Sequence, residues 1–348
     1  MRTSNNRSAL IDVCKGIGIL CVYYGHTATW GTLSSRMIFS FHMPLFFFLS
    51  GLCFNVDKIG NVKELFFRIY RGLFLPYCFF VIVGSLLRCD IVFPSWRANP
   101  VAECIKLIHG EGSSAIWFLA CLALVQVFVW TACKAENRFF SRRRERCVFG
   151  LLFCGTLLTG GFVISKYLPQ NIVRRLPCMS ASVPVGMLFF YIGNTSKSII
   201  GVFERVAVRA ATLLAAVVGG FALLFLVNLK LPAILDVRSA IFSPRVLPSC
   251  ALGLVLVLIA GKTIVVSRYL QTVFASIGER SLFLFALELP ISHIVDKITR
   301  GGLPYRCWLT DHTFSIEPIR ILTILSLAWL CSYPTMWLLS NFRRLLHV

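Results

Sequence analysis

Long apolar runs, separated by short polar segments, follow one another along the whole chain. Each run is long enough, or nearly so, to cross a hydrocarbon layer about 30 Å thick as a helix. Pro76 and Pro184 interrupt the third and sixth runs, which membrane helices tolerate when neighbouring groups satisfy the freed carbonyls. The pattern predicts an all-α, polytopic transmembrane bundle of about ten helices, near residues 9–27, 37–54, 72–87, 114–132, 147–164, 178–193, 207–229, 246–266, 272–295 and 319–340.

The composition agrees with a membrane protein and not with a soluble one. Apolar residues make up 57% of the 348 residues, charged residues make up 14%, and the mean hydropathy is +0.77. A soluble domain has about 25% charged residues. Because the spans use almost the whole length, we expect residues 1–348 to form a single membrane domain with no separate soluble domain. The first run carries Asp12 and Lys15 and lacks a small-residue cleavage site, so we expect it to stay in the mature protein.

The positive charges indicate an orientation. An arginine-rich loop at residues 134–146 lies between the fourth and fifth spans, and cytoplasmic loops are the ones enriched in Lys and Arg. We therefore expect both the N-terminus and the C-terminus in the cytoplasm. The net charge of +20 is spread over many short loops, which favours attraction to the anionic inner leaflet of the bilayer over nucleic-acid binding.

The cysteines carry little pattern despite their number, fourteen. The sequence has no CxxC and no Cys/His cluster with metal-ligand spacing, so we expect no metal site. Most of the cysteines fall inside spans, where Cys packs as a small apolar residue. Cys89 and Cys104 share one predicted outer loop and could form a disulfide in an oxidising compartment.

Ionisable residues inside spans are costly when they face lipid, so we expect them to face the bundle interior. In the first span Asp12, Lys15 and His26 point to one side of a helix that turns about 100° per residue. The same geometry puts Asp12 and His26 about 21 Å apart along the axis. They must therefore serve different ends of one internal path.

A second histidine, His42, begins the next span. If the first two helices are antiparallel neighbours, His26 and His42 meet near the outer membrane boundary. Two imidazoles there could carry out proton transfer, or each could simply cap a helix end. Arg36, in the loop between them, could contact a substrate or be solvated.

The arginine pair Arg68 and Arg71, and the glutamate Glu288, each have two possible interpretations. Arg68 and Arg71 are spaced i, i+3 at the inner boundary, where they could grip phosphates in bidentate fashion or act as ordinary positive-inside anchors. Asp12, at the same depth, is a plausible partner for one of them. Glu288, in the middle of the ninth span, could bind an acceptor or handle protons, or it could form a structural pair with an interior Arg or Lys.

Several motifs occur together in a fixed order. They are Ile11-Asp12-x-x-Lys15-Gly16-Ile17 followed by Gly25-His26, then Phe41-His42-Met43-Pro44-Leu45-Phe46-Phe47-Phe48-Leu49-Ser50-Gly51, then Arg68-x-x-Arg71-x-x-x-x-Pro76-Tyr77. In this order and spacing they closely resemble the acyltransferase-three family of integral membrane acyltransferases. Trp117-Phe118-Leu119 and Gly278-x-x-Ser281-Leu282 resemble further landmarks of that family. One position departs, because many members have a His where this chain has Glu288.

The resemblance implies transfer of an acyl group, usually acetyl from acetyl-coenzyme A, to a hydroxyl of a carbohydrate, a lipid-linked glycan or another envelope molecule. It marks the histidine of the Gly-His motif, His26, as essential. We expect His26 to act as general base or acyl carrier, with His42 beside it as an orienting or acceptor-site group. It associates Arg68 and Arg71 with the acyl-coenzyme A donor, whose arm would pass Asp12 and Lys15. We expect the remaining candidates to serve the acceptor, namely Glu288, Arg36 and Trp117.

The implied setting is the bacterial cytoplasmic membrane, with glycan-assembly proteins as possible partners. A multi-span transporter or flippase of an envelope glycan is the alternative. Such a protein typically shows matching broken helices in its two halves, and residues 1–170 and 171–348 show no such correspondence. A non-catalytic scaffold would not need the ionisable residues Asp12, His26, Arg68 and Arg71 to be aligned with one another in the first three spans.

Overall fold

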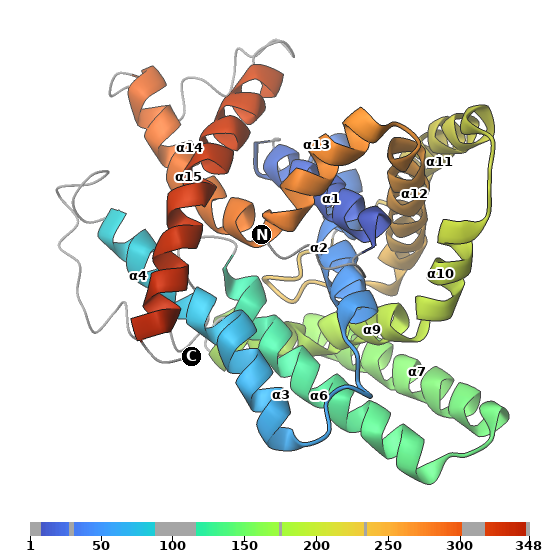
Figure 1. Cartoon of the computed structure of the whole chain (residues 1–348). Helices are drawn as coiled ribbons and strands as arrows, with labels where there is room; N and C mark the ends of the chain where they lie inside the picture. Colours follow the sequence, from blue (N-terminus) through green and yellow to red (C-terminus); the bar gives the residue numbers. More distant parts are fainter. Residues whose placement is uncertain are drawn as a thin grey trace.

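The computed structural model describes residues 8–27, 31–87, 116–173, 176–232, 235–300 and 317–345 (Figure 1). In this part of the chain the secondary structure is helical, apart from an isolated antiparallel bridge between Asp236 and Ile241. The N-terminal half contains α1 (Ala9–Thr27), α2 (Leu33–Cys53), α3 (Val62–Ile69), the π-helical turn η1 (Tyr70–Phe74), α4 (Leu75–Leu87), α6 (Trp117–Phe139), α7 (Arg143–Tyr167) and α8 (Gln170–Val173). The C-terminal half contains η3 (Pro177–Ser182), α9 (Val183–Thr195), α10 (Lys197–Arg205), α11 (Ala210–Lys230), η4 (Pro244–Val246), α12 (Leu247–Val265), α13 (Arg268–Glu279), α14 (Ser281–Arg300) and α15 (Glu317–Leu345).

The prediction of an all-α membrane bundle is confirmed. Among the described residues, seven helices are long and apolar enough to cross a membrane, or eight if α13 and α14 are counted as one bent span. They include α1, α2, α6, α7 and α11 at their full lengths, together with Pro244–Val265 and Arg320–Arg344. The count of ten and the cytoplasmic placement of both termini stay predictions.

Two predicted spans are not continuous helices. The segment 272–295 bends by 72° at Arg280, which separates α13 from α14. The segment 178–193 begins as the short 3-10 turn η3, in which Cys178 and Met179 have left-handed backbones (both φ 53°). Its α-helix starts only at Val183, where Pro184 fits because the first turn of a helix needs no N–H from that position.

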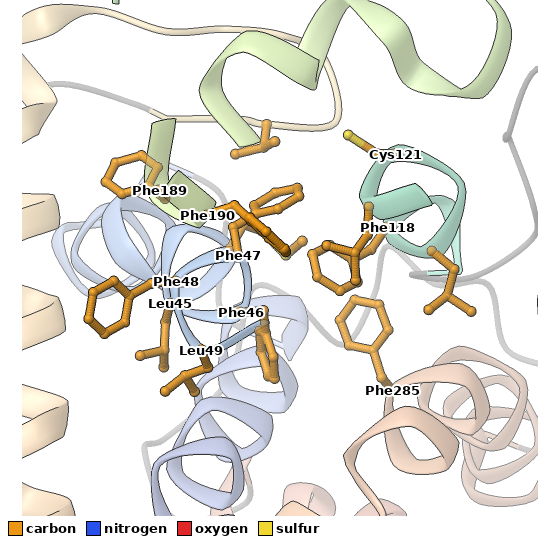
Figure 2. Packing of buried hydrophobic residues seen from close by; sticks show 14 of the residues in the cluster. Leu45, Phe46, Phe47, Phe48, Leu49, Phe118, Cys121, Phe189, Phe190 and Phe285 are labelled. Atoms are coloured by element: carbon orange, nitrogen blue, oxygen red, sulfur yellow. The ribbon is translucent and has the colours of Figure 1, made fainter. Parts of the chain in front are cut away.

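Helix α2 lies at the centre of the bundle. It packs against α1, α9, α11 and α12, and its Phe46, Phe47 and Phe48 fill the core together with Phe118 and Phe190 (Figure 2). Inside this helix Pro44 cannot bond the carbonyl of Ser40. The Cys250 thiol of α12 donates to that carbonyl instead, with a sulfur–oxygen distance of 2.8 Å, so the buried group keeps a partner.

The outer helices expose their leucines. In α7 and α11 only 11% of the most apolar window is buried, and side chains such as Leu151 (74% exposed) and Val218 (63% exposed) point away from the protein. Apolar side chains facing outward on long helices are what a lipid environment requires. The ionisable side chains Asp12, His42 and Glu288 lie instead in the interior of the bundle, where they are buried.

Candidate active site

A histidine and a glutamate from distant parts of the chain form a hydrogen bond inside the bundle. His26 of α1 donates from Nδ1 to Oε2 of Glu288 in α14 over 2.8 Å. The Glu288 side chain is 2% exposed and the His26 side chain 28% exposed. Tyr23 donates from its hydroxyl to the carbonyl of Leu284 over 2.9 Å, one turn below, and fixes the two helices relative to each other.

The partner of His26 fixes its tautomer. A carboxylate only accepts hydrogen bonds, so Nδ1 carries the proton and the neutral ring keeps its lone pair on Nε2. The carboxylate also stabilises the positive charge that appears when Nε2 takes up a proton, as the acid does in a serine–histidine–aspartate triad. The arrangement can therefore serve as a general base. The partner of Glu288 is thus a histidine; of the two interpretations from the sequence, the structural pair with an interior Arg or Lys does not match this contact, and a role in proton handling or acceptor binding stays a prediction.

The second histidine, His42, is also held through its Nδ1 atom, in this case by a backbone carbonyl. His42 is buried in α2 and donates from Nδ1 to the carbonyl of Ile38 over 2.9 Å. Its ring meets Phe39 edge to face, with ring centroids 4.9 Å apart. Because a carbonyl also only accepts, neutral His42 keeps its lone pair on Nε2 as well.

Both histidines line one cavity of about 220 Å³, which we call the histidine cavity. Trp117 at the start of α6 lines it too, as the motif suggested. The complete lining consists of His26, Phe39, His42, Met43, Trp117, Leu235, Asp236, Val237, Arg238, Phe285 and Leu289. Four of these residues come from one segment, 235–238, between α11 and α12.

Residues 235–242 form a short hairpin that is anchored to the bundle. Asp236 and Ile241 pair through two backbone hydrogen bonds. Ser182 donates to the carbonyl of Val237, and the Ser165 hydroxyl accepts from the Phe242 amide over 2.9 Å. The hairpin brings two charged residues, Asp236 and Arg238, to the cavity.

A second cavity of about 200 Å³, the lysine cavity, is lined by Lys15 and by residues directly after Arg71 and Arg280. Its lining consists of Lys15, Phe46, Leu49, Ser50, Gly72, Leu73, Phe118, Leu119, Leu122, Ser281, Leu282 and Phe285. Lys15 also forms an ion pair with buried Asp12, with an Nζ–Oδ1 distance of 3.9 Å. Lys15 and His26 are eleven positions apart, so these two lining residues lie about 16 Å apart along the axis of α1.

The paired arginines lie next to the lysine cavity, on the surface. Arg68 lies in the last turn of α3 and Arg71 in the π-helical turn η1, and both are exposed. Neither forms an ion pair within the described part of the chain, and Asp12, the partner suggested by its depth, pairs with Lys15 instead. Two cationic side chains without acidic partners suit an anionic ligand.

The π-helical turn recruits a third arginine. In η1 the amide of Leu75 donates to the carbonyl of Tyr70, and Pro76 has no amide hydrogen, so the carbonyl of Arg71 has no helical donor. Arg343 of α15 donates to it from Nη2 over 2.9 Å. This contact was not predicted, because in the sequence Arg343 looks like an ordinary positive-inside anchor near the end of the last span.

Sequence reasoning and structure differ at two other places. Arg36 lies in the first turn of α2 and not in a loop; its Nε is buried without a hydrogen-bond partner, and it is not among the residues that line the histidine cavity. The hairpin residues Asp236 and Arg238 were not predicted, because no motif marks the segment between α11 and α12. Cys89 and Cys104 lie outside the described residues. Across the described ranges, no group of His, Cys, Asp or Glu could hold a metal ion.

Comparison with known proteins identifies the family of this chain. Searches of curated proteins and of solved structures gave no significant match. A family model described as an acyltransferase domain matches residues 9–337, which is nearly the whole chain and includes α1, α14 and both cavities. The chain is therefore a multi-pass membrane protein with an acyltransferase domain, and it belongs to the acyltransferase-three family.

Proposed function

We propose that this protein is an O-acetyltransferase of the bacterial cytoplasmic membrane. It moves an acetyl group from cytosolic acetyl-coenzyme A to a hydroxyl of a carbohydrate or lipid-linked glycan of the cell envelope. The observation that carries the proposal is the hydrogen bond between His26 and buried Glu288 at the wall of the histidine cavity.

In this reaction Nε2 of His26 takes the proton of the acceptor hydroxyl while the hydroxyl oxygen attacks the thioester carbonyl. The carbon–sulfur bond breaks, and the coenzyme A thiolate leaves and receives the proton from His26. Glu288 stabilises the imidazolium between these two steps. General acid–base catalysis of this kind contributes about 10²–10⁴ in rate. Alternatively, His26 attacks the thioester itself and passes the acetyl group to the acceptor.

The donor would bind on the side of the lysine cavity. Coenzyme A is a polyanion, and Arg68, Arg71 and Arg343 supply three guanidinium groups that can pair with its phosphates in bidentate geometry. Lys15, kept in place by Asp12, lines the cavity that the pantetheine arm would enter. If the predicted orientation is correct, these groups face the cytosol, where the donor is made.

The acceptor would bind in the histidine cavity from the other side. Trp117 offers an aromatic face, and His42, Asp236 and Arg238 offer hydrogen-bonding groups, a combination that suits a sugar with several hydroxyls. The proposal gives Arg36 no direct contact with the acceptor, because Arg36 does not line this cavity. Glycan-assembly proteins would deliver or remove the acceptor.

The test uses purified protein in lipid vesicles, radiolabelled acetyl-coenzyme A and an envelope extract. We expect label to enter a glycan with the parent protein and to be lost with His26→Ala, because the general base is removed. Yield and thermal unfolding in detergent check that the variant is folded. Label transfer by folded His26→Ala would contradict the role of His26, and no transfer by the parent would favour the transporter alternative.

A further inference from the structure

Phe285 of α14 lines both cavities. The histidine cavity contains His26 and Trp117, and the lysine cavity contains Lys15 and Ser281. The Phe285 side chain is 6% exposed. Phe285 is therefore a wall that the two cavities share, and a donor that binds beside Lys15 and reacts beside His26 would meet this ring.

Two other phenylalanines complete a partition with Phe285. Phe46 of α2 and Phe118 of α6 have their ring centroids 6.2 Å apart, and each lies 5.9 Å from the ring centroid of Phe285. These distances are those of rings in direct contact. Figure 2 shows the three rings pointing toward one another from three different helices. We call this set the aromatic partition.

The three rings are not held equally. Phe118 is backed by Phe47, with centroids 4.8 Å apart, and by Trp117, with centroids 6.3 Å apart. Among the described residues, Phe46 and Phe285 each have ring contacts only to the other members of the partition. Phe285 is the member that lines both cavities. A ring beside empty space can change rotamer without displacing packed neighbours, so a movement of Phe285 is the one that would join the two cavities.

We infer that Phe285 is a specificity-determining residue that selects the acyl group of the donor by its cross-section. When its ring turns aside, it opens a passage as wide as one slender chain, which fits the unbranched cysteamine and β-alanine end of a pantetheine arm that carries a linear acyl group. A branched acyl group is wider than that end of the arm and is rejected at the partition, while the dimethyl-substituted carbon of the arm stays on the donor side of the ring. This inference rests on the proposed function, because it supposes that an acyl thioester travels from one cavity to the other.

The selection differs from that of an ordinary pocket. A pocket of limited volume discriminates by atom count, so it treats butyryl and isobutyryl groups, which have the same atoms, nearly alike. A narrow passage discriminates by width and rejects the branched isomer. The ratio of butyryl to isobutyryl transfer therefore reports on the passage and not on the space around His26.

The test compares acetyl-, butyryl- and isobutyryl-coenzyme A as donors for the parent, Phe285→Ala, Phe285→Leu and Phe190→Ala. Phe190 is the matched control, because it is fully buried in the same core but lines neither cavity, and its ring contacts Phe54 and not a member of the partition. We expect the parent to prefer butyryl over isobutyryl by about tenfold or more. Phe285→Ala and Phe285→Leu should remove most of that preference, and Phe190→Ala should keep it.

Each outcome has a distinct meaning. An unchanged preference in folded Phe285→Ala and Phe285→Leu would overturn the role of Phe285 while acetyl transfer by the parent still supports the proposed function. Equal transfer of both isomers by the parent would likewise overturn it. Absence of acetyl transfer by the parent would overturn the proposed function and this inference together.

Discussion

At the residue scale, the pair of His26 and Glu288 leads to a prediction for Glu288→Gln. The pair was not predicted from the sequence, because the two residues are 262 positions apart and no periodicity relates α1 to α14, whereas His26, His42 and Trp117, which line one cavity, were found from short motifs. In Glu288→Gln the amide can still accept a hydrogen bond from His26, so the ring keeps its place, but it lacks the charge that stabilises an imidazolium. We expect the acetylation rate at saturating donor to fall by about 10²–10⁴-fold, while binding of acetyl-coenzyme A is unchanged. Steady-state kinetics and calorimetry measure the two quantities. A variant with the rate of the parent would show that Glu288 only holds the helices together.

At the element scale, α13 lies directly against α1 (Figure 1). A β-carbon on Gly16 would overlap the carbonyl of Phe274, and one on Gly278 would overlap the carbonyl of Asp12. Hydropathy alone predicted one straight span over 272–295, because an apolar count does not distinguish a bent pair from a straight helix. The glycines were part of the motifs, but their reason, close contact between two helix backbones, became clear only in the structure.

This contact predicts a loss of stability in Gly278→Val. The added side chain must push α13 away from α1, and overpacking of this kind costs about 1–3 kcal/mol. Gly219→Val in α11 is the matched control, because a β-carbon there meets no atom within 4 Å. Thermal unfolding in detergent should show a lower Tm for Gly278→Val and little change for Gly219→Val. Equal Tm values for the two variants would contradict the close packing of α13.

At the scale of the whole molecule, the first and last thirds of the chain meet at the turn η1, beside the lysine cavity. The C-terminal helix α15 runs beside α14 and ends near the turn η1 (Figure 1), where Arg343 donates to the Arg71 carbonyl. The sequence predicted the membrane class, the family and the paired arginines. It could not predict that α15 completes their surroundings, since that depends on how the helices assemble in three dimensions.

The last prediction concerns that assembly. Arg343→Gln removes one positive charge beside Arg71, and a hydrogen bond to a charged group contributes about 1.5–3 kcal/mol. We therefore expect the KM for acetyl-coenzyme A to rise about tenfold or more. The kcat should be retained, because His26 lies three helical turns of α1 away from Lys15 of the lysine cavity. Arg344→Gln is the control, since Arg344 is exposed and adjacent in sequence. If both variants raise KM equally, a general positive surface attracts the donor; if neither does, α15 has no part in the donor site.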